Sequence, residues 1–209
     1  MFYKEKTIDR NIIVCYYWDM TMKNTFLVID TETGGLNCDK NSILSIAGVI
    51  WQPRGEISKL FDFYIKEPVM NVEERALKVN KIDLKDVYDR GLTPIEAVRT
   101  IKSALNARFG PDRRPIQLVG HNVAFDLGFI RRLYRLAGHD MNHDFRDRAL
   151  DSCSILQFLM ISGKIKGFRA SADVLFESAG VKIDEKDRHT AFGDALATAK
   201  SLDILLDKF

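Results

Sequence analysis

The sequence predicts a layered α/β domain. Strand-like runs occupy its first part and helix-like runs its second, an order typical of helices packed on a sheet. The first three strand-like runs lie too close together for crossover helices, which excludes simple alternating βαβ winding. The chain has 209 residues, of which 46% are hydrophobic, and this is enough for one domain with a sizeable core.

Three strands are expected to open the domain. Residues 25–30 read Thr-Phe-Leu-Val-Ile-Asp, a continuous apolar and β-branched run typical of a central strand buried on both faces. Residues 42–51 and 57–65 are joined by Gln-Pro-Arg-Gly, a turn sequence that predicts an antiparallel hairpin. Residues 116–119 are expected to form a fourth strand.

The expected helices have recognisable ends. Thr-Pro-Ile-Glu at 93–96 is a capping box with proline at the first helical position, and Gly110 should end that helix. Asn122 is expected to cap the next helix, whose apolar residues recur every three or four positions. Further helices are predicted over 152–161, over 171–179 with Gly180 as its C-terminal stop, and over 191–206.

Composition excludes several classes of protein. The longest apolar run, 12–18, has seven residues, whereas about 20 are needed to cross a bilayer, so no membrane association is expected. No secretory signal is recognisable, which predicts a cytoplasmic protein. The three cysteines, an odd number without CxxC spacing, indicate reduced thiols.

Residues 1–24 are expected to be an N-terminal appendage to a domain that spans 25–209, because they precede the first clear strand. Met20 and Met22 are alternative translation starts. The net charge of +2 is too small for polyanion binding by a bulk field, so any affinity for nucleic acid must be local. Eight arginines and five aspartates lie between Arg108 and Arg148, which is consistent with a local contact or with a solvated helix face.

Two carboxylates end the best strand. Asp30 and Glu32 are two residues apart, so their side chains should point to the same side of the strand. Alone, such a pair is more often structural than functional. Here Thr33, Gly34 and Gly35 follow it, and glycines allow close approach of the backbone to a ligand.

Two further acids begin helices. Asp126 shares a helical face with apolar residues, where a lone carboxylate is costly; a salt bridge with Arg131 or Arg132 is the structural alternative. Asp194 lies in the first turn of the last helix, where it complements the helix dipole. If Thr190 caps this helix, His189 belongs to the preceding loop and can face the same site as Asp194.

The four acids would repel one another if they met in one place, because like charges within about 4–6 Å cannot all ionise without an intervening cation. Oxygen-only ligands suit Mg²⁺ or Mn²⁺ rather than zinc. A pair of such ions about 4 Å apart catalyses in-line displacement at phosphorus. The sequence therefore predicts phosphodiester chemistry with two divalent cations.

The three motifs resemble those of the DEDDh group of DnaQ-like 3′→5′ exonucleases: Asp30-Thr-Glu-Thr-Gly-Gly, His121-Asn-Val-Ala-Phe-Asp126, and His189 five residues before Asp194. The resemblance covers roughly residues 25–206. It implies a ribonuclease H-like fold, with a mixed five-stranded sheet flanked by helices. It also implies that Asp30 is shared by both metals and that Glu32 and Asp194 hold the metal with the attacking water. Asp126 would serve the second metal, and His189 would be the general base.

The resemblance also suggests a set of substrate-binding residues: Thr33, Gly34, Asn80, His121, Asn122 and Phe125. Many relatives have threonine where this chain has Gly34, which leaves the preference for sugar and base open. A core role is the alternative for Phe125.

The expected activity is release of nucleoside 5′-monophosphates from the 3′ end of single-stranded DNA, as in proofreading. Trimming of RNA 3′ ends or degradation of short oligoribonucleotides is the alternative enzyme activity, and a polymerase-associated module is the other alternative. A DNA polymerase partner is less expected because the sequence ends at Phe209, directly after the last predicted helix.

Overall fold

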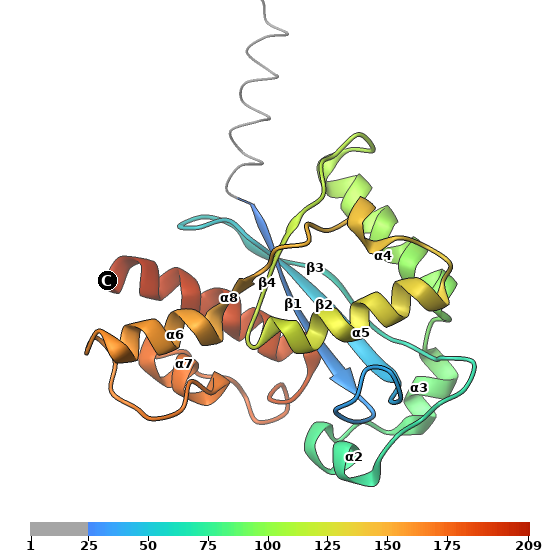
Figure 1. Ribbon diagram of the computed structural model, residues 1–209, viewed down its shortest axis with the longest axis horizontal. Helices are drawn as coiled ribbons and strands as arrows, with labels where there is room; N and C mark the ends of the chain where they lie inside the picture. The colour runs from blue at the N-terminus through green and yellow to red at the C-terminus, as the bar shows by residue number, and fades with distance from the viewer. Residues whose placement is uncertain (1–24) are drawn as a thin grey trace, which may run out of the picture.

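The computed structural model describes residues 25–209. Its middle layer is a mixed five-stranded sheet with strand order β3-β2-β1-β4-β5 (Figure 1). The strands are β1 (Phe26–Thr33), β2 (Ile43–Trp51), β3 (Ile57–Tyr64), β4 (Gln117–Gly120) and β5 (Leu150–Asp151). β2 pairs antiparallel with β1 on one side and with β3 on the other, whereas β4 runs parallel to both β1 and β5. The expected hairpin and the expected mixed sheet are both confirmed.

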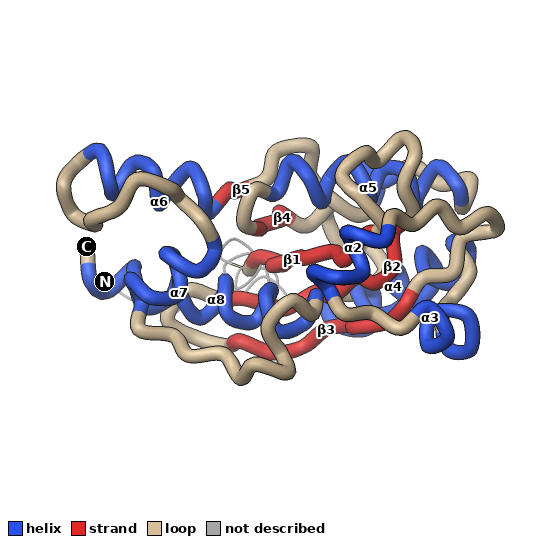
Figure 2. The backbone as a smooth tube through the Cα atoms, turned by 90° about the horizontal axis from the view of Figure 1, so that it is seen from below, coloured by secondary structure: helices blue, strands red, loops and turns tan. Residues whose placement is uncertain are grey.

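Helices cover both faces of the sheet. The helical segments are α2 (Glu74–Asn80), α3 (Leu84–Arg90), α4 (Pro94–Phe109), α5 (Val123–Leu136), the 3₁₀ turn η1 (Met141–His143), α6 (Ser152–Ile161), α7 (Ala172–Ala179) and α8 (Ala191–Lys208). Figure 2 shows α5 and α8 on opposite sides of the sheet. The central strand β1, which carries Asp30 and Glu32, therefore passes between two helical layers.

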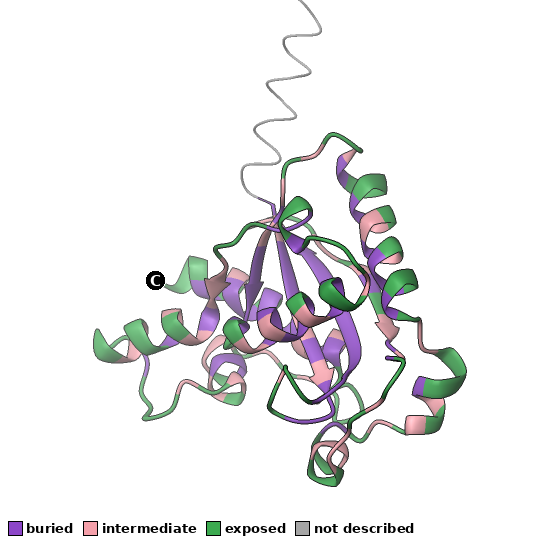
Figure 3. Cartoon of the chain, turned by 45° about the vertical axis from the view of Figure 1, so that its right-hand side comes forward, coloured by how far each residue is buried: buried purple, intermediate pink, exposed green. Residues whose placement is uncertain are grey.

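The core follows the alternation of side chains along β1. Leu27 and Ile29 pack with α4 and α5, whereas Val28 packs with α8. All nine residues of β2 are buried, as the purple strands of Figure 3 show. This alternation continues into the polar end of β1 and decides which helix each acid faces.

Most of the predicted helix ends are confirmed. The Thr93–Glu96 capping box, proline at N1, the Thr190 cap and the left-handed Gly180 are all present. Asn122 occupies the N-cap position of α5, as predicted, but it is not a side-chain cap. Asn122 has a φ of 60° and its side chain makes no cap bond. Its backbone N–H donates instead to Asp151 Oδ1 at 2.8 Å, which joins the start of α5 to the start of α6.

Sequence patterning missed α2 and α3. Each has seven residues and only one buried side chain, Asn80 in α2 and Val87 in α3. An amphipathic stripe needs several apolar residues on one face, so no such signal exists in either segment. β5 was too short to recognise, since it contributes only two residues.

Two expectations concern membrane-spanning helices and thiols. Within residues 25–209, none of the helices combines the length and apolar character needed to span a membrane. Cys38 and Cys153 carry free thiols, as predicted. Cys15 and the expected appendage over residues 1–24 lie outside the described residues.

Candidate active site

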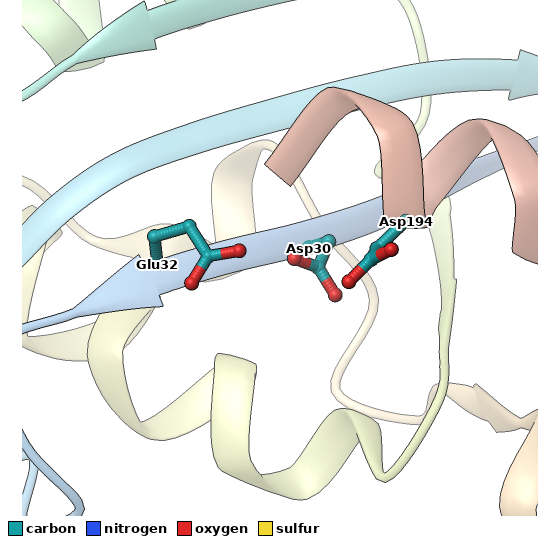
Figure 4. A group of neighbouring side chains, drawn as sticks. All are labelled: Asp30, Glu32 and Asp194. Carbon is teal, nitrogen blue, oxygen red and sulfur yellow. The ribbon is translucent and has the colours of Figure 1, made fainter. Parts of the chain in front are cut away.

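Asp30, Glu32 and Asp194 meet at the polar end of the central strand. Asp30 and Glu32 project from β1, and Asp194 comes from the first turn of α8 (Figure 4). One carboxylate oxygen from each lies within 4.8 Å of the others. The alternation that sends Val28 toward α8 also sends Asp30 and Glu32 to that side.

Asp126 reaches the same strand from the opposite layer. It lies in the first turn of α5, is 4% exposed, and uses Oδ1 to accept two hydrogen bonds from Thr31. The Thr31 N–H donates at 2.9 Å and its Oγ1 at 2.7 Å. The alternative of a salt bridge with Arg131 or Arg132 is not realised. Within residues 25–209 Asp126 forms no ion pair, and the Arg132 guanidinium pairs with Glu67 at 2.8 Å.

The four carboxyl groups perturb one another. Burial is the largest cause of a raised pKa for each of them. The pKa of Glu32 rises to about 8, with repulsion from Asp194 and Asp126 as further causes. The pKa of Asp126 rises to about 7 despite the Thr31 hydrogen bonds. The pKa of Asp30 is raised well above its usual value by burial and then by Asp126, Glu32 and Asp194.

Arg188 is a site residue that the sequence analysis missed. Its Nη1 donates to Asp194 Oδ2 at 2.5 Å, and its Nη2 binds Asp173 on α7 at 2.7 Å. The positive charge of Arg188 lowers the pKa of Asp30, Glu32 and Asp194 against the effect of burial. The available signal was its position directly before His189 in the third motif.

The oxygen donors fit a divalent metal ion. Asp194 Oδ1 is buried and, within residues 25–209, accepts no hydrogen bond, so this oxygen lacks the partner that a buried carboxylate requires. The neighbouring donors, from Asp30 and Glu32, are also carboxylate oxygens. Such an all-oxygen set suits Mg²⁺ or Mn²⁺ better than zinc.

His189 lies on the loop before α8, with a φ of 63°. Thr190 caps the helix by accepting a hydrogen bond from Gly193 N at 3.1 Å. The loop folds so closely over this turn that a Cβ on Gly193 would lie 1.9 Å from the Asp187 carbonyl oxygen. His189 Nδ1 is 3.3 Å from Arg188 Nη1.

Thr33 and Gly34 directly follow Glu32 in the chain, and Asn80 lies against them. Thr33 Oγ1 donates to the Gly35 carbonyl at 2.8 Å, and Asn80 Nδ2 donates to the Thr33 carbonyl at 3.2 Å. A Cβ on Gly34 would lie 2.7 Å from the Asn71 carbonyl oxygen. The lack of a side chain at Gly34 is therefore required by the packing of residues 71–72, besides any effect on substrate.

His121, Asn122 and Phe125 surround the start of α5. His121 uses Nδ1 toward Ser152 Oγ at 3.0 Å and Nε2 toward the Ala170 carbonyl at 2.9 Å, so both ring nitrogens hold the fold together. Burial lowers the pKa of His121. Asn122 is exposed. Phe125 is half-buried, with its ring 5.0 Å from that of Phe129 and packed against the core.

A cleft of about 700 Å³ opens beside the acids. Its wall includes Glu32, Asn80, Arg188 and His189. Both signs of charge line the rest of it, with the cations Lys81, Arg90 and Lys186 and the acids Asp62, Asp83, Asp86, Glu185 and Asp187. The cleft therefore reaches the acidic group at Glu32 and has room for a nucleotide.

The arginine-rich segment 108–148 has partly structural roles. Arg113 pairs with the buried Asp144, and Arg132 pairs with the buried Glu67. Arg108 pairs with Glu56 at 2.6 Å. These pairs account for part of the cluster without any contact to nucleic acid.

Comparisons with known proteins identify the family. The family model described as an exonuclease (RNase T type) matches residues 27–202. A DNA polymerase III subunit epsilon-like protein of Rhodobacter capsulatus is 32% identical over 181 residues, which cover 86% of this chain and 23% of that protein. Ribonuclease T of Shewanella frigidimarina is 26% identical over 193 residues, which cover 88% of this chain and 82% of that protein.

A solved structure agrees on the fold. E. coli Exonuclease I in complex with a dT13 oligonucleotide matches with a TM-score of 0.71 at 18% identity, covering 87% of this chain and 41% of that chain. The chain thus spans less than half of this structure and about a quarter of the epsilon-like relative. The expected ribonuclease H-like fold is confirmed. The chain belongs to the DnaQ-like exonuclease family, as its three motifs predicted.

Proposed function

We propose that residues 25–209 form a metal-dependent 3′→5′ exonuclease domain that removes nucleotides one at a time from single-stranded DNA. The products are nucleoside 5′-monophosphates. The observation that carries the proposal is the group of half-buried carboxylates, among them Asp194 with its unpartnered Oδ1, next to a cleft that Glu32 lines. Exonucleases of this family use divalent metal ions, and we propose two Mg²⁺ or Mn²⁺ ions here.

Each acid has a role in this proposal. Asp30, Glu32 and Asp194 offer oxygens close enough to hold one ion, and Asp30 together with Asp126, whose charge acts on Asp30, would hold the second. When bound, the ions lower the pKa of the attacking water and stabilise charge on the leaving 3′-oxygen. Thr31 fixes the orientation of Asp126 by its two hydrogen bonds, and Arg188 fixes that of Asp194.

His189 is the proposed general base. It lies at the cleft beside Glu32, on the loop that leads into Asp194. His189 would take the proton from the attacking water, which leaves a nucleophile directed at the terminal phosphodiester.

A 5′-labelled single-stranded DNA tests the activity. With Mg²⁺ or Mn²⁺ the protein should produce a descending ladder, and the Asp30→Ala variant should produce none. Absence of shortening by the wild type, or equal shortening by Asp30→Ala, would reject the proposal. Thin-layer chromatography of the released products should show nucleoside 5′-monophosphates.

Exoribonuclease activity is the second candidate. It is favoured by the match to ribonuclease T, which covers 82% of that relative. The same ladder experiment on RNA and on dinucleotides separates the alternatives, since a marked preference for RNA or for dinucleotides contradicts the DNA assignment. The name of the epsilon-like relative raises a polymerase partner as a third candidate, and co-purification of a polymerase activity with the chain would support it.

A further inference from the structure

The loop that joins α6 to α7, residues 162–171, exposes large apolar side chains together with the end of α6. Phe168 is 106% exposed, Ile161 86% and Phe158 69%. The end of α6 and the loop after it are green in Figure 3 for this reason. Contiguous exposed apolar surface of this kind marks a binding site more often than a single exposed residue does.

This loop is anchored at both ends. Ile165 is 8% exposed and packs in the cluster formed by α6, α7 and α8. The Ala170 carbonyl accepts hydrogen bonds from His121 Nε2 at 2.9 Å and from Cys153 Sγ at 3.2 Å. The exposure of Phe168 therefore results from where the anchored backbone places it.

The charge of the loop selects the kind of partner. Lys164, Lys166 and Arg169 are all exposed, and no aspartate or glutamate occurs between residues 152 and 172. None of the three cations forms an ion pair with another residue in the described part of the chain. An aromatic ring among unpaired cations is the combination that binds single-stranded nucleic acid, through stacking on bases and contacts to phosphates.

The loop is also connected to the acidic site. His121, which anchors Ala170, precedes the helix that carries Asp126. At the other end the loop leads into α7, where Asp173 binds Arg188 and Arg188 binds Asp194. Figure 2 shows the loop running back along α6 toward α7. Cys153, Gln157 and Phe168 are among the residues that line a pocket between this loop and α6.

We propose that the 162–171 loop is a binding subsite for a single nucleic-acid strand. Phe168 stacks on a base, and Lys164, Lys166 and Arg169 neutralise phosphates on the 5′ side of the nucleotide being removed. This inference rests on the proposed exonuclease function, because it assigns the loop to the same substrate.

Equilibrium binding tests the subsite without catalysis. Fluorescence anisotropy of a 5′-fluorescein 12-nucleotide oligothymidylate in EDTA should show that Phe168→Ala binds about 5- to 150-fold more weakly, as for loss of one base–aromatic stack. Phe168→Trp should bind like the wild type, since it keeps a stacking ring. Phe209→Ala is the matched control, because Phe209 is also an exposed aromatic residue, at 49% exposure.

The salt dependence tests the cations. Replacing Lys164, Lys166 and Arg169 with glutamine should reduce the slope of log affinity against log salt by about 2, because each phosphate contact on a single strand contributes about 0.7. A control removes three charges from the α3 and α4 side of the molecule, opposite α6 in Figure 1. The control substitutions are Lys85→Gln, Arg99→Gln and Arg114→Gln.

Unchanged affinity in Phe168→Ala together with an unchanged salt slope in the triple variant would overturn the subsite. Thermal melting of each variant establishes that the fold is retained. The two proposals fail in different ways. A wild type that shortens DNA while all loop variants bind normally contradicts the subsite alone. A wild type that binds through the loop but hydrolyses no strand contradicts the exonuclease assignment.

Discussion

Asp126 accepts both the backbone N–H and the hydroxyl of Thr31 on a single oxygen, Oδ1. Thr31 lies between Asp30 and Glu32 on β1 and faces the opposite side of the sheet from them. Asp126 thus fixes the strand that carries the two other acids, and its Oδ2 is left for another partner. These two hydrogen bonds therefore fix the position of Asp126 on α5 relative to the two acids on β1.

Thr31→Val should impair both stability and catalysis. The substitution keeps the shape of the side chain and removes the Oγ1 donor, which leaves a buried carboxylate oxygen with one fewer hydrogen bond. We expect a loss of about 1–3 kcal/mol in the free energy of unfolding, and a fall in kcat. Thr31→Ser retains the hydroxyl and is the control. Urea denaturation and the ladder assay measure the two effects, and equal activity of both variants would contradict the role of Thr31.

His189→Asn separates the imidazole from the backbone conformation. His189 has a φ of 63°, and asparagine is among the few residues that adopt this left-handed region readily. The variant should therefore fold normally and lose about 10²–10⁴-fold in kcat, as for removal of a general base. Unaltered melting with near-normal turnover would exclude His189 from proton transfer.

Arg188→Gln should weaken the use of metal. Arg188 holds Asp194 through Oδ2 and leaves Oδ1 for an ion. Removing a residue that orients a ligand typically costs about 10–100-fold in metal affinity or activity. We expect the half-saturating Mg²⁺ concentration in the ladder assay to rise by that factor. Asp173→Asn keeps the contact with Asp194 and removes the outer anchor, so its effect should be smaller. Similar Mg²⁺ dependence in wild type and Arg188→Gln would contradict this role.

The stability of the protein in EDTA should fall as pH rises. Folding raises the pKa of Glu32 from 4.5 to about 8, so between these values the folded state holds a proton that the unfolded chain has released. The free energy of unfolding therefore decreases with rising pH across this window. Urea titrations at pH 5 and pH 8 measure this decrease. Mg²⁺ should offset it by favouring the ionised carboxylates.

Glu32→Gln provides the control for this titration. Glutamine carries no charge at either pH, so the decrease in stability should be smaller in the variant. A stability that increases from pH 5 to pH 8 in EDTA would mean that burial does not raise the pKa of Glu32 in solution.

Sequence patterning predicted the central parts of the fold well because their signals are local. The continuous apolar run of β1, the capping box at 93–96 and the glycine stop of α7 each depend on neighbouring residues. α2 and α3 escaped prediction because their few buried residues form no periodic pattern. Asn122 makes no side-chain cap because its backbone is left-handed, with a φ of 60°, whereas a capping side chain needs an extended backbone. The bond from its N–H to Asp151, 29 positions away, was equally beyond local patterning.

In the candidate site, too, features with a local sequence signal could be predicted, whereas features that depend on distant residues could not. The spacing of Asp30 and Glu32 predicts that they share a side of the strand, and the structure places them together with Asp194. The partner of Asp126 could not be predicted, since Thr31 is 95 positions away. The contact of Arg188 with Asp173 on α7 and that of His121 with Ser152 on α6 likewise involve residues of other helices. These contacts exist only after the chain has folded.

Side chains along β1 face α5 and α8 in turn, so the four acids come together only when both helices are packed on the sheet. Asp126 is supplied by α5 and Asp194 by α8. Detachment of either α5 or α8 from the sheet would disperse the four acids, so an ion that binds only the complete group opposes unfolding of the whole domain. By mass action, an ion at 100 times its dissociation constant contributes about 2.7 kcal/mol. The supply of divalent cation in the cell would thereby govern how long the folded protein survives proteolysis as well as how fast it works.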